Sequence, residues 1–109
     1  MSEYLSLRVN KNLKDDFNAV CKKRGYTPSR AVRLFCINYI KDKKAPYPDM
    51  LNRIRKYSDE DLERVGFRIV KAVRSDFQAI CKENGEDKMS NVIRAFMDYC
   101  ATNDCLPFK

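Results

Sequence analysis

The chain contains an internal duplication, and this limits its architecture more than any other feature of the sequence. The best-matched stretches read LSLRVNKNLKDDFNAVCKKRG at residues 5–25 and VGFRIVKAVRSDFQAICKENG at residues 65–85. Eight of these 21 aligned positions are identical, and most of the differences keep the side-chain chemistry. After the shared glycine the second copy gains one residue, and SRAVRLF at 29–35 then matches SNVIRAF at 90–96. A repeat of this length indicates one structural unit written twice.

Each copy has the pattern of a strand followed by two helices. Apolar residues alternate along the start of each copy, which predicts a half-buried strand of about six residues. A lone strand has two unpaired edges, so we expect the two strands to pair with each other. The apolar spacing that follows predicts a first helix, ended by Gly25 or Gly85 in the left-handed conformation. Second helices are expected over about 28–42 and 88–102. The alternating residues are Leu5, Leu7 and Val9 in the first copy and Val65, Phe67 and Ile69 in the second.

The second helices indicate that the two copies fold together. Both are apolar over more than one face, and a helix of this kind is buried from several sides. One copy alone is too short to cover such a helix, so the copies are expected to pack on each other. The predicted fold is mainly α with a two-stranded antiparallel β-ribbon, in which two tandem repeats form one globular unit. We assign residues 1–44 to repeat 1, residues 45–64 to a linker and residues 65–109 to repeat 2.

Local signals predict where helices begin and how the connecting segments behave. Thr27 followed by Pro28 predicts the start of a helix, and Asp87 is the expected cap in the second copy. In the linker, Pro46 and Pro48 are expected to break the helix that precedes them.

Two further segments lie outside the helices. Ser58 and Asp61 have the spacing of a capping box, which predicts one short helical turn. The C-terminal stretch TNDCLPFK is expected to be an irregular tail that docks Leu106 or Phe108 on the core.

Composition places the chain among soluble globular proteins of one domain. It has 109 residues, of which 44% are apolar, and no apolar run approaches the ~18 residues of a membrane span. The opening residues MSEYLSLR have no apolar signal-peptide stretch, so we expect a cytoplasmic protein. No membrane partner and no small-molecule substrate are expected.

The five cysteines are expected to be reduced in that compartment. Cys21, Cys36, Cys81 and Cys100 fall among apolar residues, where cysteine acts as a small hydrophobic side chain. Cys100 and Cys105 give the one weak hint of a metal site, but there is no CxxC pair and no histidine. The chain also lacks a glycine-rich phosphate loop and a clustered carboxylate pair, so we expect neither an enzyme nor a cofactor or metal.

Positive charge is concentrated in the first copy. The net charge of +7 consists of +7 in residues 1–44, −1 in residues 45–64 and +1 in residues 65–109. An excess of this size predicts an anionic partner, and its distribution predicts an asymmetric contact surface.

The order strand, helix, glycine turn, helix, with SLRV opening and SRAVR or SNVIR beginning the last helix, resembles the ribbon-helix-helix DNA-binding proteins of the Arc and MetJ class. Two copies in one chain resemble the TraY-type plasmid transfer proteins. The resemblance implies an intrachain pseudo-dimer whose ribbon enters the major groove of double-stranded DNA. It also implies a prokaryotic, plasmid or viral origin, and association with a second copy of the chain on adjacent DNA sites.

The outward-facing residues of such a ribbon would contact bases. Arginine at the equivalent positions 8 and 68 can donate two hydrogen bonds to guanine, whereas Gly66 has no side chain to read a base, which argues against a perfectly palindromic site. Without the resemblance, both arginines are equally well explained as solvent-exposed residues of an amphipathic strand. The predicted base contacts are Tyr4, Ser6, Arg8, Arg64, Gly66 and Arg68.

Phosphate contacts are expected at the starts of the second helices and just after the strands. Backbone N–H groups at a helix N-terminus attract anions. The predicted phosphate contacts are Lys11, Pro28, Ser29, Arg30, Lys71, Lys88, Met89 and Ser90.

Other polar residues near these positions have structural explanations. Ser29 and Ser90 are also explained as residues that stabilise helix starts. For Arg33 and Arg94 we favour a structural role through ion pairs with the acidic linker. Residues 22–24, with the sequence KKR, are best explained as a solvated charged face.

The leading prediction is a sequence-specific DNA-binding protein that acts as a transcriptional repressor. An accessory factor for an origin of transfer would use the same ribbon. A protein-interaction module that keeps the fold, either an antitoxin or a phage-encoded inhibitor, is the alternative, and Gly66 and the near-neutral second copy favour it slightly.

Overall fold

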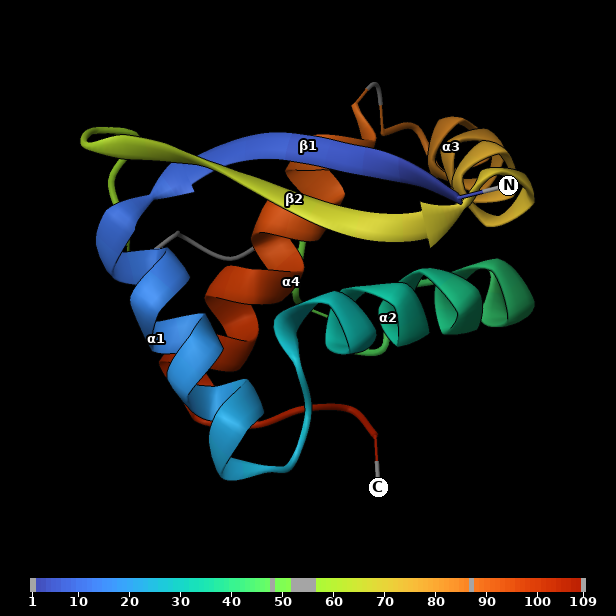
Figure 1. Ribbon diagram of the computed structural model, residues 1–109. Coiled ribbons are helices and arrows are strands. Elements are labelled where there is room, and N and C mark those ends of the chain that lie inside the picture. Colours follow the sequence, from blue (N-terminus) through green and yellow to red (C-terminus); the bar gives the residue numbers. More distant parts are fainter. Residues whose placement is uncertain (1, 48, 52–56, 87, 109) are drawn as a thin grey trace.

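The computed structural model describes residues 2–47, 49–51, 57–86 and 88–108. Strands β1 and β2 form an antiparallel two-stranded sheet that lies across one side of the helices (Figure 1). The predicted class, mainly helical with a two-stranded antiparallel ribbon, is confirmed. In chain order the elements are β1 (Ser2–Asn10), α1 (Lys11–Lys23), α2 (Pro28–Asp42), β2 (Leu62–Val70), α3 (Lys71–Glu83) and α4 (Met89–Asn103).

The two strands pair over their full length. Each is nine residues long, longer than the predicted six, and β2 begins at Leu62 rather than at Val65. The register is centred on the pair Ser6 and Gly66, which occupy the same position of the sequence repeat. The alternating apolar residues 5, 7, 9, 65, 67 and 69 are buried, so the predicted half-buried pattern is confirmed.

The helix ends follow the local signals in part. Gly25 and Gly85 have φ angles of +79° and +82°, the left-handed conformation predicted for them. Thr27 caps α2, because its hydroxyl accepts a hydrogen bond from the Arg30 N–H at 3.1 Å. In the second copy the cap residue of α4 is Lys88, whose side chain makes no capping hydrogen bond. Asp87, the expected cap, lies outside the described residues.

The expected helical turn at residues 58–61 is wrong, because tertiary hydrogen bonds outweigh the capping-box pattern. The Asn10 side chain donates to the Glu60 carbonyl at 2.8 Å and to the Ser58 hydroxyl at 3.3 Å. Asp61 has a φ of +51°, and its carbonyl accepts from the Lys11 N–H at 3.0 Å. The segment is therefore an irregular, bent connection that leads the chain into β2. Pro48 lies outside the described residues.

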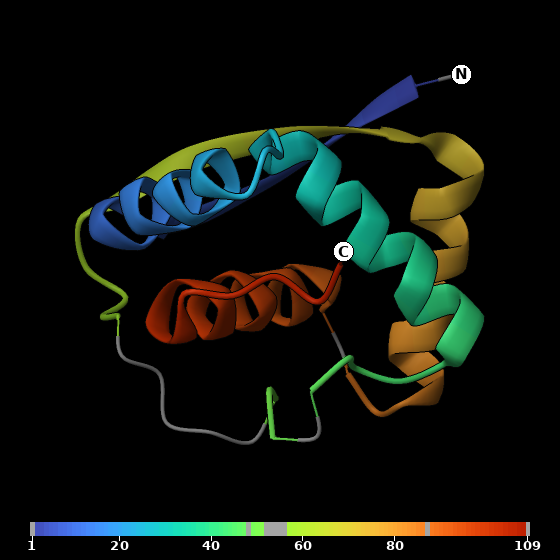
Figure 2. The same cartoon turned by 90° about the horizontal axis from the view of Figure 1, so that it is seen from below.

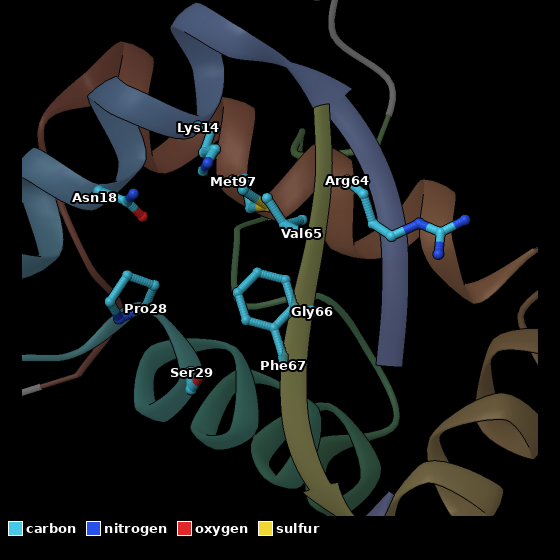
Figure 3. Close-up of a pocket in the computed structure, with 9 residues that line it drawn as sticks. All are labelled: Lys14, Asn18, Pro28, Ser29, Arg64, Val65, Gly66, Phe67 and Met97. Atoms are coloured by element: carbon cyan, nitrogen blue, oxygen red, sulfur yellow. The ribbon is translucent and has the colours of Figure 1, made fainter. Parts of the chain in front are cut away.

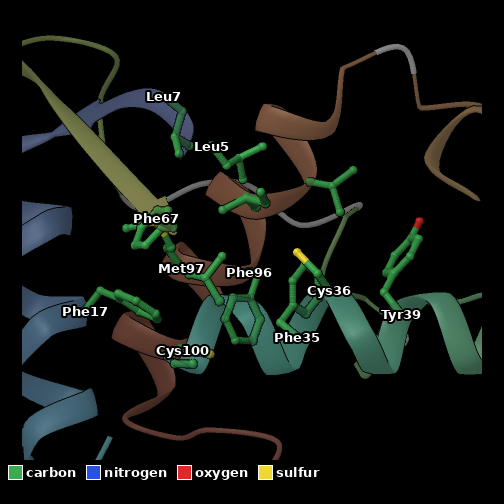
Figure 4. Packing of buried hydrophobic residues seen from close by; sticks show 14 of the residues in the cluster. Leu5, Leu7, Phe17, Phe35, Cys36, Tyr39, Phe67, Phe96, Met97 and Cys100 are labelled. Carbon is green, nitrogen blue, oxygen red and sulfur yellow. The ribbon is translucent and has the colours of Figure 1, made fainter. Parts of the chain in front are cut away.

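Each helix packs mainly on a helix of the other copy. Helix α1 packs on α4 and α2 packs on α3, and the four helices surround a common core (Figure 2). Phe35 and Phe96, which are equivalent in the repeat, stack at the centre with ring centroids 4.1 Å apart (Figure 4). Phe17 meets Phe96 edge-on at 5.9 Å, and Phe77 meets Phe35 in the same way at 5.9 Å. Neither copy therefore holds a complete core of its own.

The segment between the copies is anchored on α4 and α1. The Tyr47 ring stacks on Tyr99 with centroids 4.1 Å apart. The Tyr57 hydroxyl donates to the Asp16 carboxylate at 2.6 Å, and the Tyr57 N–H donates to Asp98 at 3.4 Å. Burial and the neighbouring Asp16 raise the pKa of Tyr57, so its hydroxyl keeps the proton that it donates.

The C-terminal tail docks as predicted. Leu106 is buried, and the Phe108 ring lies 5.6 Å from the Tyr26 ring. Lys23 forms an ion pair with Asp104 at 2.7 Å, which lowers the pKa of that carboxyl.

Four of the five cysteines are buried, as predicted. Burial raises the pKa of Cys21 to about 11 and that of Cys81 to about 12, so both thiols are protonated at neutral pH. Cys105 is half-buried, with its Sγ 3.4 Å from the Tyr47 hydroxyl. Among the described residues, no group of three His, Cys, Asp or Glu side chains could hold a metal ion. None of the helices in the described ranges is both long and apolar enough to cross a membrane.

The stacked pair at the centre predicts a large effect on stability. Phe96→Ala should lower the free energy of unfolding by roughly 3–5 kcal/mol, because the cavity lies where both copies meet. Phe108→Ala, at the edge of the core, should cost only about 1 kcal/mol. Urea denaturation followed by circular dichroism measures both, and equal costs for the two variants would contradict this assignment of the core.

Candidate nucleic-acid interface

The six predicted base-contact residues lie together on the exposed face of the ribbon. The opposite face is apolar and packs on the helices, because successive side chains of a strand point to opposite sides. Among the described residues, Tyr4 is the most exposed of the large apolar side chains, at 64%. A two-stranded ribbon fits the DNA major groove, so the geometry allows this face to reach base edges. The exposed residues are Tyr4, Ser6, Arg8, Arg64, Gly66 and Arg68.

At one end of this face two arginines stand opposite each other. Arg8 pairs with Arg64 in the strand register, and both are exposed. Like charges directly opposite each other destabilise an antiparallel pair. An anion bound between them would remove this repulsion, so this end of the ribbon is suited to a negatively charged partner.

The other end is arranged differently. Arg68 lies opposite Tyr4, with its guanidinium 5.5 Å from the centre of the tyrosine ring. Its Nη2 also donates a hydrogen bond to the Tyr4 hydroxyl at 3.3 Å. A Cβ atom at Gly66 would come within 3.4 Å of the Tyr4 ring, so the ring lies beside the glycine. Gly66 thus makes room for an aromatic side chain, which the sequence pattern did not reveal.

The two helix starts expected to bind phosphate differ from each other. At α2, Pro28 carries no N–H and the Arg30 N–H is bonded to Thr27, which leaves the Ser29 N–H as the donor among these three residues. The Arg30 guanidinium stacks over the Tyr26 ring at 4.9 Å.

At α4 the side chain of the cap residue Lys88 makes no capping hydrogen bond. Ser90 and Met89 are half-buried there, and Lys88 is exposed. The two helix starts therefore offer different groups to an anion, and the predicted phosphate contacts at both of them stay a prediction. Lys11 and Lys71 are exposed at the first positions of α1 and α3, directly after the strands.

A pocket of about 360 Å³ joins the ribbon to the start of α2 (Figure 3). Its lining combines predicted phosphate and base contacts with two residues of α1 that sequence reasoning missed, Lys14 and Asn18. Their spacing of four places both on one helix face, but only the tertiary structure shows that this face borders β2. Lys14 forms an ion pair with Glu63 at 3.0 Å. The lining consists of Lys14, Asn18, Pro28, Ser29, Arg64, Val65, Gly66, Phe67 and Met97.

Arg94 has a structural role, as expected. Its Nε and Nη2 atoms donate to the Arg8 carbonyl at 3.2 and 2.8 Å, and its Nη1 donates to Asn91 at 2.9 Å. Arg94 therefore ties α4 to the backbone of β1. Arg33, its counterpart in α2, is half-buried. Residues 22–24 are exposed, as expected for a solvated face.

Comparison with known proteins identifies a family for the first copy. A family model described as RelB antitoxin matches residues 2–61, which contain β1, α1, α2 and the whole segment between α2 and β2. RelB is an antitoxin of the ribbon-helix-helix type, so the match agrees with the resemblance in fold. It spans one copy of the repeat and does not address the tandem arrangement. Comparisons with curated proteins and with solved structures gave no match.

The opposed arginines predict a gain in stability when one is neutralised. Arg64→Gln should raise the free energy of unfolding by about 0.2–1 kcal/mol at low salt, because it removes the repulsion with Arg8. The gain should shrink in 1 M salt, where screening acts within ~3 Å. Denaturation at the two salt concentrations tests this, with Lys82→Gln at the end of α3 as the matched charge control. A loss of stability in Arg64→Gln would show that the two side chains do not repel.

Proposed function

The chain belongs to the RelB antitoxin family, and we propose that it is an antitoxin, which binds and neutralises a protein toxin. The family match carries this proposal, because it covers a whole strand–helix–helix unit. The net charge of +7 supports it as well, since a basic protein is suited to a partner with an acidic surface.

We propose DNA binding through the ribbon as a second function. The observation that favours it is the exposed pair Arg8 and Arg64, because two facing guanidinium groups call for an anionic partner. In the major groove these side chains and that of Arg68 can donate to guanine O6 and N7. In this proposal the Ser29 N–H and Lys11 contact phosphates, which would position the ribbon without specifying sequence. Repression of a promoter and marking of an origin of transfer would both use this contact.

We also propose that the two repeats form an intrachain pseudo-dimer. The register centred on Ser6 and Gly66 supports this, as does the stacking of Phe35 on Phe96, since each pair occupies equivalent positions of the repeat. A ribbon whose strands belong to one chain would not dissociate on dilution, whereas a ribbon shared by two chains would.

The DNA-binding proposal predicts a strong effect of the two equivalent arginines. Arg8→Ala/Arg68→Ala should lower the affinity for a selected duplex by about 100-fold, because each bidentate contact to a base is worth about 1–3 kcal/mol. Lys22→Ala/Lys82→Ala removes the same charge from the last turns of α1 and α3, and should lower the affinity by less than about threefold. Fluorescence anisotropy at physiological salt measures both. Equal losses in the two double variants would mean that the binding is generic charge attraction.

The antitoxin proposal predicts rescue from a toxin. Co-expression of the chain with toxins that partner RelB-family antitoxins should restore bacterial growth for at least one of them, and the two proteins should co-elute as a complex. The Arg8→Ala/Arg68→Ala variant should rescue equally well if the toxin binds away from the exposed ribbon face. No rescue and no complex with any such toxin would contradict the antitoxin proposal and leave the DNA measurement unaffected.

A further inference from the structure

The exposed face of the ribbon is not the same at its two ends. Arg8 and Arg68 are equivalent in the repeat, but the residue opposite each of them differs. Arg8 faces Arg64, whereas Arg68 faces Tyr4. Tyr4 and Arg64 occupy equivalent positions of the repeat, as do Ser6 and Gly66, so the ribbon departs from two-fold symmetry at these two pairs. One end therefore presents two cations and the other presents one cation held against an aromatic ring.

The contact between Tyr4 and Arg68 restrains the arginine. The ring face attracts the guanidinium at 5.5 Å, and the hydroxyl accepts a hydrogen bond from Nη2 at 3.3 Å. A long side chain held in this way loses less rotamer freedom when it binds a base. Arg8 has no ring opposite it, because its cross-strand neighbour is Arg64.

Gly66 belongs to the same arrangement. The Tyr4 Cδ1 atom lies 3.4 Å from the place of a Cβ at position 66, and the Tyr4 Cε1 atom lies 4.0 Å from it. A serine at this position, as at the equivalent Ser6, would extend a hydroxyl into the space beside the ring. The glycine thus leaves space for the Tyr4 ring on the ribbon. Aromatic side chains cover strand glycines of a neighbouring strand in a similar way.

We propose that Tyr4 is a positioning residue for Arg68, and that the ribbon therefore binds a non-palindromic DNA site in a single orientation. This rests on the proposed DNA binding. The end with Arg68 reads its base with a restrained guanidinium, and the end with Arg8 and Arg64 reads with two arginines that repel each other. The two half-sites then differ in sequence, and the chain binds the duplex in one orientation only.

The proposal is tested by making the two ends alike. Fragments are selected from random-sequence duplex DNA with the wild type and with Tyr4→Arg/Gly66→Ser, which copies the residues of the Arg8 end onto the Arg68 end. The wild type should enrich a motif with unequal half-sites, and the variant should enrich a palindrome. The reverse variant, Ser6→Gly/Arg64→Tyr, should enrich the other palindrome and protects the test against misfolding of the first.

The outcomes separate this proposal from the function on which it rests. A palindromic wild-type motif, or unequal half-sites retained in both variants, would overturn the single orientation while leaving sequence-specific binding intact. No enrichment by any of the proteins would overturn DNA reading itself.

A second measurement isolates the positioning role. In Tyr4→Phe the ring stays and the hydrogen bond is lost, so base discrimination at the Arg68 half-site should fall about threefold, and in Tyr4→Ala about tenfold. Discrimination at the Arg8 half-site should not change in either variant. Equal losses at both half-sites would assign Tyr4 a merely structural role.

Discussion

The antiparallel pairing of β1 with β2 is the constraint on which the rest of the structure depends. Each strand is the first element of its copy, and each would leave both edges unpaired without the other. The pairing brings together segments 60 residues apart, and it sets the helices of one copy against those of the other around Phe35 and Phe96. It also decides which side chains face outward. A slip of one residue would turn the arginines toward the core and the apolar residues toward solvent.

Much of the fold could be predicted because its determinants are local and periodic. The alternation at Leu5, Leu7 and Val9 reports burial of one strand face, and the glycines at 25 and 85 report a backbone conformation that other residues avoid. The repeat also predicts the strand pairing. Each copy has one strand without a partner, so the two strands are expected to pair with each other. The outward face of the candidate site followed from the same alternation.

The remaining features depend on contacts between distant parts of the chain. The support that Tyr4 gives to Arg68 arises from cross-strand register, and no spacing along the sequence encodes it. The tie from Arg94 to the Arg8 carbonyl is of the same kind. The helical turn predicted at residues 58–61 does not form, because the buried Asn10 side chain donates a hydrogen bond to that segment. The same side chain caps α1, since it accepts from the Leu13 N–H at 3.2 Å. Val70, the counterpart of Asn10, cannot cap α3, so the two copies differ where their strands end.

The proposal that the paired strands form a DNA-binding ribbon is tested most directly by titrating the isotopically labelled chain with duplex DNA. The titration is followed by backbone amide NMR at physiological salt. The account predicts that the largest shift changes fall in residues 4–8 and 64–68, with smaller ones at 29–30 and 88–90. It also predicts saturation at one chain per site, because a single chain supplies both strands of the ribbon. Shift changes confined to the outer faces of α1 and α3, with the ribbon unaffected, would contradict it.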